Sequence, residues 1–313
     1  MDYAKVQEPI LPLLRSTEKI LTGHIGSKVR LISELRRHTP VGKGKKVRAA
    51  FFFLLAGMNR LKDDNLAQVA AAIEMLHLSS LVHDDIVDNS AWRRGEKTPN
   101  HHFGNYLSVL WGDYLFINSI RMLTSDKRQA IIRMMLAAAK QMIEGQILEF
   151  ENNFNYRIQT RTYYDIIRKK TSSMFANIAG LVPLLKGGPA RADADFFRFG
   201  QDVGMIFQIS DDLLDIFSDQ AGKSCFQDLR EGKVTLPYIL LLRHGALPLI
   251  KNFSRSGPQP LLERCRALGI KEQSLQIIDR YYRKCASFLE TFPPSAHRES
   301  MANLLEFIRY RDY

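Results

Sequence analysis

The chain contains 313 residues, of which 45% are hydrophobic and 25% are charged. This balance is ordinary for a globular protein and excludes disorder over most of the length. Lysine and arginine number 44 against 33 aspartates and glutamates, so the formal net charge is +11. The excess of positive charge indicates an anionic partner, such as a phosphate, a nucleic acid or an acidic membrane surface, without choosing among them.

Apolar residues recur at intervals of three and four along most of the chain, which predicts helices. The predicted helices cover residues 3–23, 46–59, 64–84, 106–124, 126–151, 162–185, 192–219, 233–245, 271–291 and 297–312. Alternation with a period of two is scarce, and the glycine- and proline-containing segments between helices are too short to be interdomain linkers. The sequence therefore predicts one all-α domain over residues 1–313, a bundle of about ten or more helices.

The cysteines and the start of the chain indicate a reducing compartment. Cys225, Cys265 and Cys285 form no C-x-x-C pair, which argues against a disulfide framework and a cysteine-based zinc site. The first ten residues lack a basic segment followed by an apolar one, so no secretory signal is expected. The longest apolar run, Ala49–Gly57, is far shorter than the roughly 20 residues of a membrane span. We therefore expect a cytoplasmic protein.

Two acidic motifs of the form D-D-x-x-D end two apolar helical segments, 127 positions apart. Residues four apart share a helix face. The first and last aspartates of each motif therefore project together, namely Asp84 with Asp88 and Asp211 with Asp215. Burying carboxylates without a counter-charge is costly, and Mg²⁺ binds carboxylates together with water and substrate phosphates. One such motif is often a solvated helix end, but two on apolar helices favour a metal site.

Basic residues flank both motifs and could contact phosphate oxygens that a metal ion leaves exposed. They are the loop at residues 42–48, Arg93 and Arg94, Lys169 and Lys170, and Lys223 and Lys233. The loop lacks the P-loop pattern, and a single lysine is more often on the surface than in a site. His77 lies seven residues before Asp84 on nearly the same helix face. The sequence leaves two roles open for it, a residue of the core or a contact with phosphate. Nucleic-acid binding is disfavoured, because no nucleic-acid-binding motif occurs and the acidic motifs repel a polyanion.

In these segments the sequence resembles the trans-polyprenyl diphosphate synthases, which are chain-elongating prenyltransferases. The resemblance spans nearly the whole chain and rests on residues 44–48, 81–88, 93–95, 112–115, 170–171, 208–215, 222–223 and 228–233. It implies an isoprenoid-synthase type of all-α bundle around a deep central cavity, usually a homodimer. It also implies an enzyme of isoprenoid biosynthesis that joins isopentenyl diphosphate to an allylic diphosphate by trans 1′–4 addition.

The resemblance implies a role for each matching residue. Asp84 and Asp88 would bind Mg²⁺ on one side of the allylic diphosphate, and Asp211 with Asp215 on the other, with about three ions in all. The allylic diphosphate or its metal shell would contact Arg93, Lys170, Thr171, Gln208, Lys223 and Lys233. The isopentenyl diphosphate would contact Lys45, Arg48, His77 and Arg94. Ions and side chains would stabilise the departing diphosphate, the double bond of isopentenyl diphosphate would attack the allylic cation, and diphosphate would remove the final proton.

The sequence departs from the family pattern at four positions. Ala49 and Lys97 stand where proline is common, Gln146 where glutamate is common, and Phe226 where glycine is common. None of these changes removes a metal or phosphate ligand. Phe226 is expected to alter closure of the loop that contains Lys223.

Residues before the first motif bear on product length. Ser80 and Ser79 stand four and five positions before Asp84, where short-chain farnesyl synthases have bulky aromatic residues, and Leu76 and Met75 lie one step deeper. Small serines leave the path of the growing tail open, so we expect a product longer than farnesyl. The alternative is that the serines only bond back to helix carbonyls and the floor lies elsewhere.

Other functions compete with this reading. They are a short-chain farnesyl or geranylgeranyl diphosphate synthase, a class I terpene cyclase or squalene-type synthase, and a non-catalytic subunit of a two-component synthase. The second acidic motif and the predicted isopentenyl diphosphate residues disfavour a cyclase, and the presence of both motifs disfavours a non-catalytic subunit. Weak attachment to an anionic membrane surface is compatible with catalysis, because a long prenyl product must reach lipid.

Overall fold

The computed structural model describes residues 3–42, 44–93, 95–124, 129–187, 194–218 and 225–310. Helices account for most of these residues. The strands among them form one antiparallel hairpin of β1 (Trp92–Arg93) and β2 (Glu96–Lys97), in which Trp92 pairs with Lys97. The predicted all-α class is confirmed.

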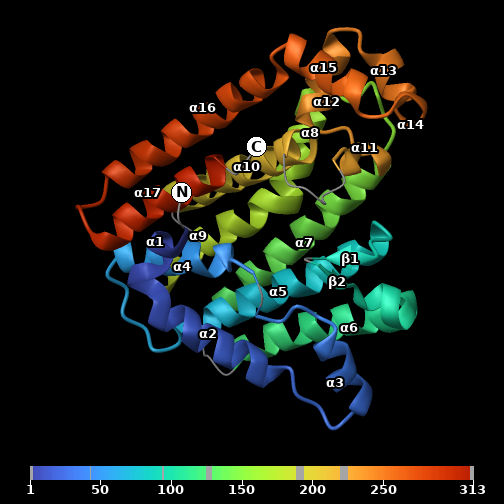
Figure 1. Ribbon diagram of the computed structural model, residues 1–313. Helices are drawn as coiled ribbons and strands as arrows, with labels where there is room; N and C mark the ends of the chain where they lie inside the picture. Colours follow the sequence, from blue (N-terminus) through green and yellow to red (C-terminus); the bar gives the residue numbers. More distant parts are fainter. Residues whose placement is uncertain are drawn as a thin grey trace.

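The N-terminal half consists mainly of long helices packed side by side (Figure 1). They are α1 (Tyr3–Gln7), the 3₁₀ turn η1 (Glu8–Ile10), α2 (Leu11–His24), α3 (Arg30–Arg37), α4 (Val47–Met58), α5 (Leu66–Val87), α6 (Pro99–Thr124) and α7 (Gln129–Glu151). The predicted helix at residues 3–23 is interrupted at Pro9, which has no N–H for an α-helical bond. α6 begins before the predicted residue 106 and has a kink at Gly104, where φ is +79°.

The C-terminal half adds two further long helices, α10 and α16, which contribute to the same core (Figure 1). Its elements are α8 (Thr160–Ile167), the π-helical turn η2 (Arg168–Ser172), α9 (Ser173–Leu185), α10 (Ala194–Phe217), α11 (Gln227–Arg230), α12 (Leu236–Arg243), α13 (Leu247–Lys251), α14 (Phe253–Ser256), α15 (Gln259–Ala267), α16 (Ile270–Glu290) and α17 (Ala296–Arg309). The ends of predicted helices at residues 126–128, 192–193, 219 and 311–312 lie outside the described residues.

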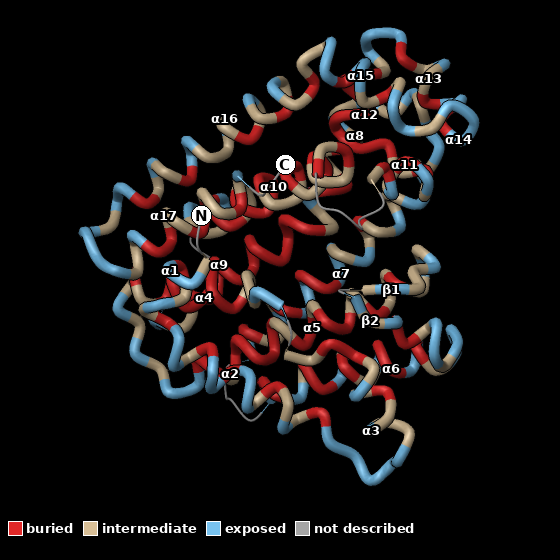
Figure 2. Tube along the Cα trace, in the orientation of Figure 1, coloured by how far each residue is buried: buried red, intermediate tan, exposed pale blue. Residues whose placement is uncertain are grey.

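One hydrophobic core runs from Val6 to Ile308, and Figure 2 shows its buried centre along α4, α5 and α9. α5 packs against α6, and α10 packs against α9 and α16. By length and hydropathy α5 could span a membrane, but 67% of its most apolar window is buried inside the fold, as in the core helix of a globular protein. Because α5 and α10 are central, the acidic motifs at their C-terminal ends are held by the core.

Two glycines allow neighbouring helices to close on the π-helical turn η2. A Cβ atom on Gly145 of α7 would lie 2.4 Å from the backbone nitrogen of Lys170, and one on Gly204 of α10 would lie 2.4 Å from Ser172 Cα. Such distances leave no room for a side chain. Turns of this type often occur at functional sites, and here the turn presents Lys170 and Thr171 from between two close-packed helices.

Candidate active site

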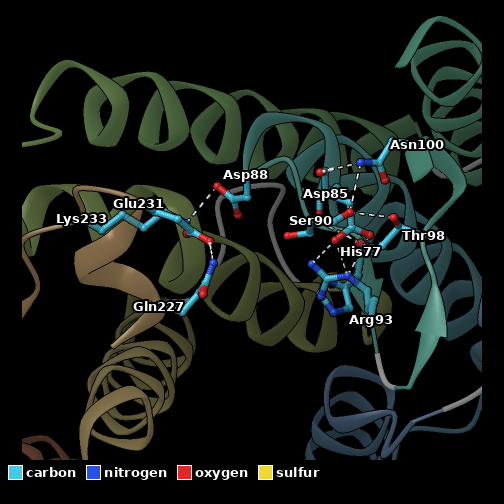
Figure 3. A network of polar contacts seen from close by, with 11 residues as sticks. His77, Asp85, Asp88, Ser90, Arg93, Thr98, Asn100, Gln227, Glu231 and Lys233 are labelled. Atoms are coloured by element: carbon cyan, nitrogen blue, oxygen red, sulfur yellow. Dashed lines mark hydrogen bonds and ion pairs between the residues drawn. The ribbon is translucent and has the colours of Figure 1, made fainter. Parts of the chain in front are cut away.

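The middle aspartate of the first motif is paired with the hairpin that follows it (Figure 3). Asp85 is 2% exposed, and Arg93 Nε lies 2.7 and 2.9 Å from its two carboxylate oxygens. Burial raises the pKa of Asp85, while the hydrogen bonds and charge of Arg93 oppose that rise. Arg93 therefore lies beside the motif, as predicted, but its guanidinium group ties β1 to the end of α5. Its contact with an allylic diphosphate stays a prediction.

The outer aspartates of the first motif lie beside two lysines from distant segments. Lys233 Nζ is 3.0 Å from Asp88 Oδ1. Lys170 donates to Glu149 of α7 and also interacts electrostatically with Asp84. Burial raises the pKa of Asp84, and Lys170 opposes that rise. Burial by itself lowers the pKa of Lys170, but Glu149 and Asp84 outweigh burial, so this pKa is raised and the ammonium stays charged.

The second motif is held by a chain of hydrogen bonds that starts at η2. Thr171 Oγ1 donates to Gln208 Oε1 at 2.6 Å, and Gln208 Nε2 donates to Asp212 Oδ1 at 2.9 Å. The phenol of Tyr163 donates to the other oxygen of Asp212. Burial raises the pKa of Asp212 to about 7, although both hydrogen bonds oppose the rise. Two predicted allylic-site residues, Thr171 and Gln208, are thus brought together and linked to the motif.

The last aspartate of the second motif is anchored by two donors. Asp215 accepts the backbone N–H of Gln227 at 2.7 Å and the Tyr238 hydroxyl at 3.3 Å. Burial raises the pKa of Asp215, and burial together with the charges of Asp215 and Asp212 raises the pKa of Asp228 well above its usual range. Asp228 therefore enlarges the acidic group around the motif.

Three of the four residues predicted for isopentenyl diphosphate surround the start of α4. Arg48 Nη1 lies 2.9 Å from His77 Nε2, and the Arg48 guanidinium lies 5.3 Å from the ring centre of Phe175. Lys45 Nζ lies 4.4 Å from the ring centre of Phe307. The first of these contacts joins α4 to α5. The fourth predicted residue, Arg94, and the allylic-site residue Lys223 lie outside the described residues.

One departure from the family pattern has a direct structural consequence. The backbone N–H of Ala49 donates to Glu74 Oε1 at 2.8 Å. Proline, common at this position, has no N–H and could not make this bond. The Glu74 carboxylate thus satisfies one of the free donors in the first turn of α4, which also contains Arg48.

The two serines proposed to affect product length make different hydrogen bonds. The Ser79 hydroxyl donates to the carbonyl of Gly112 in α6 at 2.9 Å, whereas the Ser80 hydroxyl donates to the His77 carbonyl in its own helix at 2.8 Å. Ser79 is 3% exposed. Ser80 stands one helical turn before Asp84 and so shares its face of α5. Deeper in α5, Met75 and Leu76 are buried as well.

Several residues around the site were missed by the sequence reading. They are Glu149, Tyr163, Gln227, Asp228, Glu231 and Tyr238. The sequence could have indicated three of them. Asp228 and Glu231 lie within segment 228–233, which carries the family resemblance, and Glu149 lies three residues after Gln146, behind two apolar residues. The two tyrosines had no such signal, because their contacts depend on how distant helices pack.

The donor set fits divalent magnesium. Within the residues that the structure describes, no group of three or more histidine, cysteine, aspartate or glutamate side chains could hold a metal ion by itself. Mg²⁺ usually takes one or two carboxylates and completes its shell with water and substrate phosphates. Burial raises the pKa of Asp84 and Asp215, and a nearby cation would favour their charged forms.

Comparison with known proteins finds relatives along the full chain. The profile of the family described as Polyprenyl synthetase matches residues 29–257. The chain is 30% identical over 322 residues to the octaprenyl diphosphate synthase of Escherichia coli (strain K12), covering 100% of both chains. It is 30% identical over 304 residues to heptaprenyl diphosphate synthase component 2 of Bacillus subtilis (strain 168), covering 95% of this chain and 87% of the other.

Solved structures show the same fold. A decaprenyl diphosphate synthase from Rhodobacter capsulatus is 25% identical and superposes with a TM-score of 0.89, covering 100% of both chains. A polyprenyl synthase from Caulobacter crescentus CB15, complexed with calcium and isoprenyl diphosphate, is 24% identical and superposes with a TM-score of 0.92, covering 100% of this chain and 98% of the other.

Proposed function

The chain belongs to the polyprenyl synthetase family, and on that premise we propose that it is a Mg²⁺-dependent prenyltransferase that joins isopentenyl diphosphate to an allylic diphosphate. The product is a polyprenyl diphosphate longer than farnesyl, as the names of its octaprenyl and heptaprenyl relatives suggest. The observation that carries the proposal is that the two acidic motifs, from α5 and α10, lie close together: Glu149 acts electrostatically on both Asp84 and Asp212. Lys170 and Lys233 lie beside Asp84 and Asp88 of the first motif.

Each group of residues has a distinct task in this reaction. Asp84 and Asp88 on one side, and Asp211 with Asp215 on the other, would hold about three magnesium ions, which would supply positive charge to the departing diphosphate. Lys170 and Lys233 add positive charge at the same place, since their pKa values are raised despite the lowering effect of burial. Lys45 and Arg48 hold the second diphosphate so that its double bond lies close to the cation. Phe175, a buried aromatic side chain 5.3 Å from the Arg48 guanidinium, helps to exclude water from that cation.

We propose a cytoplasmic enzyme with weak attachment to an anionic membrane surface. Cys225, Cys265 and Cys285 are all free thiols, as expected in a reducing compartment. The basic net charge favours contact with anionic lipid, into which a long prenyl product must pass.

We also propose a homodimer formed through α6 and α7. Two adjoining helices present exposed apolar stripes with helical spacing, and their members are between 42% and 78% exposed: Tyr106, Val109, Leu110 and Ile117 on α6, and Leu136, Ile143, Ile147 and Phe150 on α7. A surface of this kind on two packed helices is typical of a protein interface, and a second copy of the chain is the partner that the family favours.

Sedimentation should therefore give a mass of twice 35.9 kDa. Replacing Ile143 and Ile147 together by aspartate places charges in the interface and should give the monomer mass. Aspartate at Val29, which is 57% exposed but lies outside α6 and α7, should leave the dimer intact. A wild-type protein that sediments as a monomer would refute the dimer.

Product analysis tests the reaction and its length together. The purified protein with Mg²⁺, isopentenyl diphosphate and an allylic primer should form chains longer than farnesyl. Ser80→Phe places a large ring on the same face as Asp84 and should shorten the product. Ser79→Phe should in addition lower the thermal midpoint, because Ser79 is tightly packed against Gly112 of α6. No condensation product with any primer would refute the proposed function, and unchanged length in both variants would refute this tail path.

A further inference from the structure

A continuous chain of polar contacts crosses from one acidic motif to the other, and Figure 3 shows its part from Asp88 through Lys233 and Glu231 to Gln227. Lys233 Nζ lies 3.0 Å from Asp88 Oδ1 and 2.6 Å from Glu231 Oε2. The other Glu231 oxygen accepts Gln227 Nε2 at 2.6 Å, and the Gln227 backbone N–H donates to Asp215 Oδ1 at 2.7 Å. We call this series, Asp88–Lys233–Glu231–Gln227–Asp215, the mouth bridge. It links the first motif to the second through direct protein contacts.

The central lysine of the mouth bridge is well shielded and firmly placed. The side chains of Lys233, Asp88 and Glu231 are only 12%, 18% and 16% exposed. The backbone N–H of Lys233 donates to the Asp228 carbonyl at 2.8 Å, which fixes the base of the side chain. Ion pairs at this depth are screened less than surface pairs. The ammonium therefore neutralises much of the charge that Asp88 offers to a cation.

We propose that Lys233 is the resident counter-ion of Asp88 in the substrate-free enzyme, and that Glu231 and Gln227 are positioning residues that share and steady it. A divalent cation on Asp88 Oδ1 has to displace the ammonium, because two cations on one oxygen repel each other. Glu231 then keeps the displaced ammonium close to the first motif, where the diphosphate becomes its new anionic partner. The inference rests on the proposed function and adds to it the residue, Lys233, that keeps the binding of metal at Asp88 weak until diphosphate arrives.

Titration of the substrate-free protein with Mn²⁺, followed by the paramagnetic resonance signal of the free ion, tests this exchange. Lys233→Gln should bind Mn²⁺ about tenfold more tightly than the wild type. Lys233→Arg keeps a cation at the position and should stay within about twofold of the wild type. Lys140→Gln is the matched control, because Lys140 is 78% exposed and pairs at 3.8 Å with Glu144 on α7, and its affinity should not change.

Glu231 provides an independent arm. Glu231→Gln leaves Asp88 as the ion-pair partner of Lys233, with Glu149 acting on the ammonium from farther away. Mn²⁺ should therefore bind more weakly than to the wild type. In the Lys233→Gln background the effect of Glu231→Gln should shrink at least about threefold, since the residue that it positions is gone. A purely structural role of Glu231 would lower the thermal midpoint equally in both backgrounds without this non-additivity.

The outcomes separate this inference from the proposed function. Equal or weaker Mn²⁺ binding by Lys233→Gln, or an equal effect of Glu231→Gln in both backgrounds, overturns the mouth bridge as a counter-ion device. If Asp88→Asn and Asp211→Asn also bind Mn²⁺ as the wild type does, the metal site itself is refuted. If these asparagine variants lose Mn²⁺ while Lys233→Gln is unchanged, the metal site stands and the exchange alone fails.

Discussion

Replacing Asp84 or Asp211 by alanine should remove nearly all turnover while the chain stays folded. Each residue opens one of the two acidic motifs, and loss of a metal-binding carboxylate should cost at least the roughly 10–100-fold measured for residues that only support metal ligands. Asp195→Ala is a suitable control, because Asp195 pairs with Arg198 on an exposed face of α10. Initial rates at saturating Mg²⁺ measure the effect, and a variant with more than a tenth of wild-type turnover would remove that aspartate from the metal site.

The same Asp84 variant should be no less stable than the wild type at neutral pH without metal. Burial raises the pKa of Asp84 in the folded state, so the folded state binds its proton more tightly than the unfolded state does. The stability from this group is present below the unfolded pKa and is lost as pH rises through the folded pKa. Ionised Asp84 therefore disfavours folding at neutral pH, and alanine relieves that cost. Thermal midpoints across the acid and neutral range distinguish lost chemistry from a lost fold.

Adding a single methyl group at Gly145 or Gly204 should damage both stability and turnover. A Cβ at either position would lie 2.4 Å from atoms of the turn η2, and one of these is a backbone nitrogen that cannot move aside alone. Overpacking of this kind costs about 1–3 kcal/mol. Because the turn presents Lys170 and Thr171, its displacement should also reduce the rate. Denaturant unfolding and steady-state kinetics on Gly145→Ala and Gly204→Ala measure the two effects.

Gly23 offers the opposite expectation in the same experiment. It lies in α2, and a Cβ there would meet nothing within 4 Å. Alanine at this position should stabilise the protein by about 0.5–1 kcal/mol, since glycine is entropically unfavourable inside a helix. If Gly145→Ala were as stable as Gly23→Ala, the close approach of α7 to η2 would be wrong.

The long helices could be predicted because their signal is local. Apolar periodicity over many turns identified the stretches that became α5, α7, α10 and α16. The short elements lacked that signal. α3 and the three helices from α13 to α15 span too few turns to show a period, and the β1–β2 hairpin has two residues in each strand. The π-helical turn was also missed, because its extra residue is held by the packing of α7 and α10 rather than by its own sequence.

The candidate site divides in a similar way. Thr171 and Gln208 were assigned to the same substrate by resemblance, and they are in fact hydrogen-bonded. Which side chain pairs with each aspartate could not be predicted. Asp85 is paired with Arg93, eight residues on, and Asp212 with the phenol of Tyr163 on another helix. Helix geometry places residues of one motif around an axis, but it says nothing about which distant side chain reaches each of them.

The sequence by itself determined the helical class, the family and the kind of chemistry, because motif spacing and apolar periodicity are properties of short segments. Only the tertiary structure decided that the ammonium of Lys233, 145 residues along the chain, pairs with Asp88. It also decided that Gly145 and Gly204 let α7 and α10 pack directly against the turn that contains Lys170. The physical reason is that a buried charge needs a partner within a few ångströms, and the position of that partner depends on how whole helices pack, which no local pattern encodes.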